Sequence, residues 1–157
     1  MESSYLQINF ICNLNKLVNV LHPSLKINED ACLYVIKCLE FLYQKSSDIE
    51  NALPCTELHK HALLEKEKML KKYSDYGLDS CGLYLDVNNI RYLSQKVLSE
   101  KQMVGVLAVL EYVAAEILEL SGNYCMDKDM DIIDVEDIKL VLSSDQEFCV
   151  LFKEFNH

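Results

Sequence analysis

The sequence predicts an all-α protein built from two similar halves. Residues 103–126 are apolar on most sides of a helix, so this helix needs neighbours on two or three sides. The 157 residues include only four Gly and two Pro, which is typical of helices joined by few tight turns. In each half, the apolar spacing predicts a short, a long and a short helix in succession.

In the first half, a helical stripe of apolar residues over 5–20 ends at His22-Pro23, because the residue before a proline disfavours the α region. Asn28 is expected to cap a second helix over 29–45. Ser47 is expected to cap a short third helix over 48–53, which Pro54 ends.

A charged amphipathic helix over 56–72 follows, and 73–86 is expected to be a connector. Asp86 then caps a helix predicted over 87–98, and a loop at 99–102 leads into the long helix. The inward residues of the 87–98 helix are expected to be Ile90, Leu93, Val97 and Leu98.

After the long helix, Ile132-Ile133 is expected to be extended. Asp134 and Asp137 resemble a capping box for a helix over 135–143. A last helix is expected to begin at Ser144 or Asp145, and its apolar residues are Phe148, Leu151, Phe152 and Phe155.

A long helix between two short ones is the plan of the histone fold. One such unit leaves the apolar face of its long helix uncovered, whereas two units in tandem cover each other. The expected architecture is therefore a pair of tandem histone folds packed as an intramolecular pseudo-dimer, monomeric in solution. Residues 1–157 form one domain, with 5–72 as the first fold and its extra helix, 73–86 as the connector, and 87–157 as the second fold and its last helix.

Composition narrows the class of protein. Seven cysteines, an odd number with no C-x-x-C spacing, and a start without a signal segment predict reduced thiols in the cytosol or nucleus. The net charge is −10, and Arg91 is the sole arginine. Since phosphate binding depends on Lys and Arg, direct DNA binding is not expected.

Several runs of the second half closely resemble nucleosomal histone two-A: 108–123, 132–133, 135–140 and 143–147. Three runs, 21–35, 85–90 and 109–118, resemble the amino-terminal tandem histone domain of Son of sevenless proteins, which are Ras guanine-nucleotide exchange factors. The resemblance spans about residues 6–155.

This resemblance implies a regulatory domain that is not an enzyme and carries no cofactor. It implies docking onto the linker between the pleckstrin-homology domain and the catalytic region of the same exchange factor, which favours autoinhibition and involves Ras only indirectly. It also implies contact with acidic phospholipids and a cytoplasmic protein recruited to the inner face of the plasma membrane.

The candidate partner-binding site is an acidic patch. Tyr112, Glu116, Glu119 and Asn123 follow one another at helical spacing and so share a face. The resemblance adds neighbouring residues and assigns the patch to a basic linker residue, with Glu116 and Asp145 receiving it. The full set is Glu111, Tyr112, Glu116, Glu119, Asp145 and Glu147. The open alternative is a solvated charged face without a partner.

A candidate lipid-binding set lies on the 56–72 helix, although acidic residues dilute its charge and an ion-paired face is the open alternative. Its members are Lys60, Lys66, Lys68, Lys71 and Lys72.

No metal site is expected. Cys55, His59 and His61 lack an evident fourth zinc ligand. The run that begins at Asp127 resembles the start of a calcium loop but has Ile132 and Ile138 where such a loop needs Gly and Glu.

The alternative to a regulatory domain of an exchange factor is a partner-binding histone-fold subunit of a chromatin or transcription complex.

Overall fold

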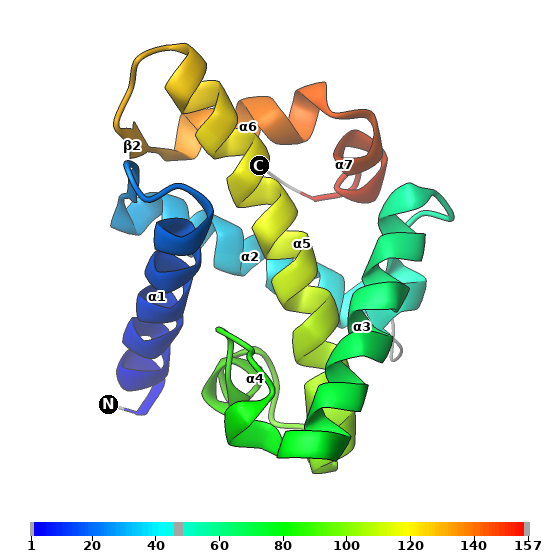
Figure 1. The fold of residues 1–157 in the computed structure, drawn as a ribbon. Coiled ribbons are helices and arrows are strands. Elements are labelled where there is room, and N and C mark those ends of the chain that lie inside the picture. Colours follow the sequence, from blue (N-terminus) through cyan, green and yellow to red (C-terminus); the bar gives the residue numbers. More distant parts are fainter. Residues whose placement is uncertain (1, 46–48, 156–157) are drawn as a thin grey trace.

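The computed structural model describes residues 2–45 and 49–155, and within them it is mainly helical (Figure 1). This confirms the all-α class. A few residues form two short 3-10 turns, η1 and η2, and two very short strands, β1 and β2. The elements are α1 (Glu2–Leu21), β1 (Lys26–Ile27), α2 (Glu29–Lys45), η1 (Ile49–Ala52), α3 (Glu57–Tyr76), η2 (Leu78–Ser80), α4 (Val87–Leu93), α5 (Glu100–Asp127), β2 (Ile132–Ile133), α6 (Val135–Ser144) and α7 (Gln146–Leu151).

Helix α5 is the core of the molecule (Figure 1). Leu107, Leu110 and Ile117 are fully buried, and they belong to one apolar cluster with residues of α1, α2, α4 and α6. Helix α3 packs along the first half of α5, where Met69 meets Val104 and Ala108. The all-round apolar character of α5 is therefore satisfied by neighbours on several sides.

The two halves of the chain meet at the C-terminal end of α1 and along its middle. At its C-terminal end, the loop before α2 pairs with the loop after α5, because β1 and β2 run parallel with Lys26 opposite Ile132. Along the middle of α1, buried Asn13 donates to Oδ1 of Asn89 at 3.0 Å, and Asn89 donates to Oδ1 of Asn9 at 3.0 Å. Buried amides need partners, so this network favours one alignment of α1 on α4.

Four helix starts follow the capping logic of the sequence. Asn28 accepts a hydrogen bond from the backbone N–H of Ala31 at 2.8 Å, and α2 spans Glu29–Lys45 as expected. Asp86 and Asp134 each form a capping box, and Asp145 caps α7. Ser47 and Asp48 lie outside the described residues; a short 3-10 turn, Ile49–Ala52, occupies the rest of the third segment.

Several expected boundaries were wrong. Helix α3 continues to Tyr76, so 73–76 are helical rather than part of the connector. Helix α5 begins at Glu100, because Ser99 and Gln102 form a capping box where a loop was expected. The last helix ends at Leu151, although Phe152 beyond it is buried.

The segment after α4 differs most from expectation. Helix α4 ends at Leu93, and Ser94 is extended, with φ −158° and ψ 151°. The Ser94 hydroxyl accepts from the backbone N–H of Lys96 at 3.0 Å, a local bond that competes with the helix. Val97, expected to point inward, is 96% exposed.

Within the described ranges 2–45 and 49–155, no helix joins sufficient length with sufficient hydropathy to cross a bilayer.

We expect Leu107→Asp and Val109→Asp each to unfold the domain. Both side chains are 0% exposed, and an unpaired carboxylate there adds a desolvation cost to the roughly 1.5–3 kcal/mol of lost apolar burial. Ile8→Asp, at a position 58% exposed, is the matched control. Thermal melts followed by circular dichroism measure the effect; a soluble Leu107→Asp protein that melts like the wild type contradicts the central position of α5.

Gly122 and Gly105 of α5 should respond oppositely to alanine. A Cβ at Gly122 would lie 2.2 Å from Cδ2 of the buried His22 ring, whereas one at Gly105 would meet only the flexible end of Lys66 at 3.1 Å. We expect Gly122→Ala to destabilise the fold by about 1–3 kcal/mol. Gly105→Ala should be neutral or stabilise it by up to about 1 kcal/mol, because alanine favours helix.

Urea denaturation measures both glycine variants. Equal free energies of unfolding for Gly122→Ala and Gly105→Ala would show that His22 does not pack against α5 as described.

Candidate functional site: the acidic face of α5

Two elements, α5 and the start of α7, bring carboxylates together beside the middle of α5. Tyr112, Glu116 and Glu119 follow one another on α5 at helical spacing. Asp145 and Glu147, at the start of α7, lie close enough to Glu116 to act on its charge. We call Tyr112, Glu116, Glu119 and Asp145 the acidic face, because the other two members of the expected set prove to have structural partners.

Glu116 is the electrostatic centre of the acidic face. It is half-buried, and burial is the main reason that the pKa of its carboxyl group lies above the ordinary value. The negative charges of Glu119 and Asp145 raise this pKa further, while His61 on α3 opposes them. A carboxylate in this setting gains stability from any cation that comes close.

Tyr112 supplies a hydrogen-bond donor to the same surface. Burial, with added repulsion from Glu116 and Glu147, raises the pKa of its phenol to about 12. The hydroxyl therefore stays protonated at neutral pH and carries no charge of its own.

Glu147 is already engaged by α3. Its carboxylate accepts hydrogen bonds from the hydroxyl of Thr56 and, at 2.8 Å, from the backbone N–H of Leu58. These bonds cap the positive N-terminal end of α3. Glu147, expected to bind a partner, therefore has a structural role instead. Sequence spacing could not indicate this role, because Leu58 and Glu147 lie 89 positions apart.

Glu111 also has a structural role. Its carboxylate accepts from the backbone N–H groups of Tyr84 and Leu85, the latter at 3.1 Å, and so anchors the chain that enters α4. Burial raises the pKa of Glu111 and outweighs these two bonds, which lower it.

Asp145 uses one oxygen to accept from Phe148 N–H at 3.0 Å.

Helix α3 contributes residues that sequence reasoning left out of the site. His61 and Glu65 act electrostatically on the acidic face, and His61 lies 3.7 Å from Glu57, measured from Nε2 to Oε2. The apolar residues Leu58 and Ala62, spaced i, i+4 and both buried, are the sequence pattern that predicts packing of this helix against the core.

The expected lipid-binding lysines of α3 are largely neutralised. Lys60 pairs with Glu57 at 3.2 Å and Lys68 with Glu65 at 3.3 Å. Lys66 reaches Glu50 at 2.7 Å and is only partly exposed. Among 2–45 and 49–155, Lys71 and Lys72 are the members of the set with no acidic partner.

In the part of the chain that the structure describes, no three His, Cys, Asp or Glu side chains converge to hold a metal ion. Cys55, the first of the residues considered for zinc, is exposed.

No known protein-family profile matches the chain. It is similar to the protein Son of sevenless of Drosophila melanogaster, with 29% identity over 87% of this chain. The aligned region is 9% of that protein, so the chain spans about a tenth of the length of this relative. The similarity supports a region related to Son of sevenless.

Proposed function

We propose that the chain is a pair of tandem histone folds that serves as a non-catalytic regulatory domain of a Ras guanine-nucleotide exchange factor. The exchange activity would reside elsewhere in a longer chain. The proposal rests on the similarity to Son of sevenless together with one observation: Glu116 sits half-buried beside Glu119 and Asp145, and within residues 2–45 and 49–155 none of these three carboxylates pairs with a lysine or arginine.

The tandem arrangement is supported by how the two long helices meet. Helices α2 and α5 share the central apolar cluster, and α2 passes behind α5 (Figure 1). The loop before one long helix pairs with the loop after the other through β1 and β2. Such pairing is what two units related by an approximate twofold axis require, because each loop then meets the opposite loop of its partner unit.

The proposed mechanism is capture of a basic linker residue by the acidic face. A guanidinium can bond two carboxylate oxygens at once, and Glu116, Glu119 and Asp145 offer several. Partly exposed contacts of this kind are worth about 1–3 kcal/mol. That energy biases an autoinhibited state five- to roughly 150-fold without locking it.

Other parts of the molecule fit this class better than a nucleic-acid or membrane function. The loop over 127–134 carries Asp127, Asp129, Asp131 and Asp134, which repel phosphate. Lipid binding through α3 does not enter the proposal, since three of its five candidate lysines are ion-paired.

Weakening the negative charge of the acidic face should raise basal nucleotide exchange by the full-length exchange factor. We expect Glu116→Lys with Asp145→Asn to do so about five- to 100-fold, from the coupling energy above. Asn keeps the cap of α7 that Asp145 provides, which a lysine there would remove.

The matched control is Glu67→Lys, an exposed position of α3 that faces away from His61 and Glu65. Exchange is followed by release of a fluorescent nucleotide from Ras in solution, without membranes. Unchanged basal exchange in a folded Glu116→Lys, Asp145→Asn protein removes the docking proposal.

The tandem arrangement also predicts the oligomeric state. Because each unit covers the other within one chain, the protein should elute as a monomer near 18 kDa. A dimer that persists on dilution would instead favour the alternative, a histone-fold subunit that pairs with another chain.

A further inference from the structure

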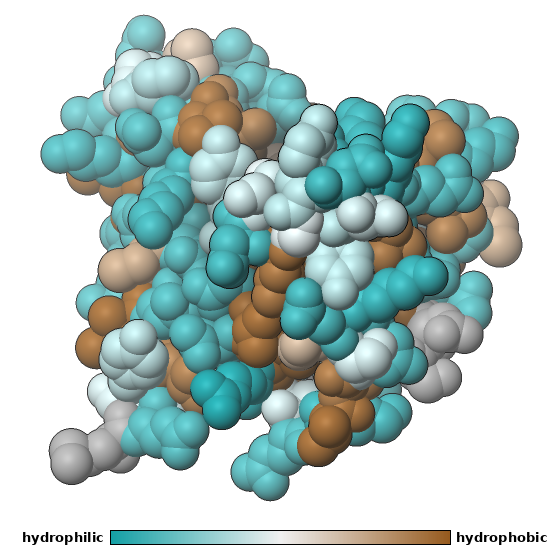
Figure 2. All heavy atoms as spheres, turned by 60° about the horizontal axis from the view of Figure 1, so that its bottom comes forward, coloured by the Kyte–Doolittle hydropathy of each residue, from teal (hydrophilic) through white to brown (hydrophobic). Residues whose placement is uncertain are grey.

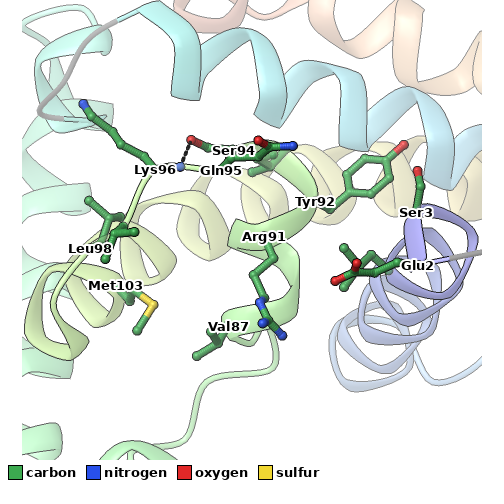
Figure 3. A pocket seen from close by; sticks show the side chains of 13 residues that line it. Glu2, Ser3, Val87, Arg91, Tyr92, Ser94, Gln95, Lys96, Leu98 and Met103 are labelled. Carbon is green, nitrogen blue, oxygen red and sulfur yellow. Dashed lines mark hydrogen bonds between the residues drawn. The ribbon is translucent and has the colours of Figure 1, made fainter.

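A groove of about 830 Å³ lies between the start of α1, helix α4 and the segment that leads into α5 (Figure 3). We propose that this groove binds an apolar peptide segment that carries a carboxylate. The proposal concerns a different surface from the acidic face and does not depend on it.

One wall of the groove is apolar and exposed to solvent. Val97, at 96%, is the most exposed large apolar residue among those described, and Leu98 and Met103 are partly exposed beside it. On the face that Figure 2 turns forward, where α4 and the start of α5 lie, apolar atoms are visible among hydrophilic ones. Covering such atoms with another apolar chain is favourable because it removes them from water.

The backbone conformation keeps this wall exposed. If α4 continued to 98, as its apolar spacing predicts, Val97 would turn toward the core. The extended Ser94 and its bond to the N–H of Lys96 end the helix instead and direct Val97 outward. The exposed valine therefore follows from a defined local structure.

The same groove contains the cations that select the partner. Arg91, the sole arginine of the chain, projects from α4 into the lining of the groove (Figure 3). Its guanidinium donates a long hydrogen bond to Oδ1 of Asn88 at 3.5 Å. Within the described residues, neither Arg91 nor Lys96 has an ion-pair partner. Glu2, on the opposite wall, is the acidic side chain that lines the groove.

Charge complementarity identifies the class of occupant. An exposed guanidinium beside apolar atoms pairs with a carboxylate and leaves the apolar wall for neighbouring side chains. A short peptide can supply both the carboxylate and the apolar side chains while touching only the groove, away from the acidic remainder of the protein surface. An anionic bilayer would face a chain with a net charge of −10, so a peptide fits better than a membrane.

Two capped hexapeptides test the proposal, one alternating leucine with aspartate and one alternating leucine with lysine. Each is titrated into the ¹⁵N-labelled protein and followed by amide chemical shifts. We expect the aspartate peptide to shift resonances of α4 and the 94–98 segment and to bind about tenfold tighter than the lysine peptide. No shift at millimolar peptide, or equal binding of the two, overturns the proposal.

Three variants assign the effect to the groove. Arg91→Glu should reverse the preference between the peptides, and Val97→Asp should weaken binding of the aspartate peptide about tenfold. Val97 has almost no packing to lose, so this second variant folds even if the first does not. Lys37→Glu, at an exposed position of α2 outside the groove, should change nothing.

Three results would contradict the assignment. The first is a Lys37→Glu effect as large as that of Arg91→Glu, which would make the preference a matter of net charge. The second is binding of wild-type protein to phosphatidylserine vesicles that Arg91→Glu abolishes. The third is a dimer that Val97→Asp dissociates, which would make a second copy the occupant.

Discussion

The burial of α5 is the constraint on which the rest of the structure depends. A helix with Leu107, Val109, Leu110 and Ile117 fully enclosed cannot be covered by a single neighbour. Helices of the first half supply much of the cover, so neither half of the chain could hold its apolar residues away from water alone. The buried Asn13–Asn89 bond adds specificity to this packing, because any other alignment of α1 and α4 leaves amides without partners.

The acidic face owes its chemistry to the same burial. Polar residues on a helix that is largely enclosed can reach solvent only along a narrow strip, which puts Glu116 and Glu119 close together. Burial then raises the pKa of Glu116 more than any single neighbour does. A fully solvated carboxylate would gain little from a cation, since water screens exposed pairs. Half-burial makes the same contact worth more.

Local signals in the sequence predicted the helix starts well. Asn28, Asp86, Asp134 and Asp145 all cap helices, because a short polar side chain can satisfy an N-terminal N–H without help from the rest of the fold. The prediction that residues 94–98 continue the helix was wrong. Their apolar spacing suits a helix, but the hydrogen bond of the Ser94 hydroxyl and the capping box at Ser99 favour a break before α5. Periodicity alone carries no information about this competition.

Long-range contacts explain what the sequence could not predict about the site. The spacing on α5 puts Glu116 and Glu119 on one face, but no local signal shows that Glu147 has a distant structural partner while Asp145 does not. The structure distinguishes the two residues by giving Glu147 to the N-terminus of α3, which leaves Asp145 with one oxygen for other partners. That bond also holds α7 against α3, so the shape of the acidic face depends on a carboxylate that a partner does not need to touch. A loss of binding on mutation of Glu147 would therefore report the position of α7 rather than direct contact with a cation.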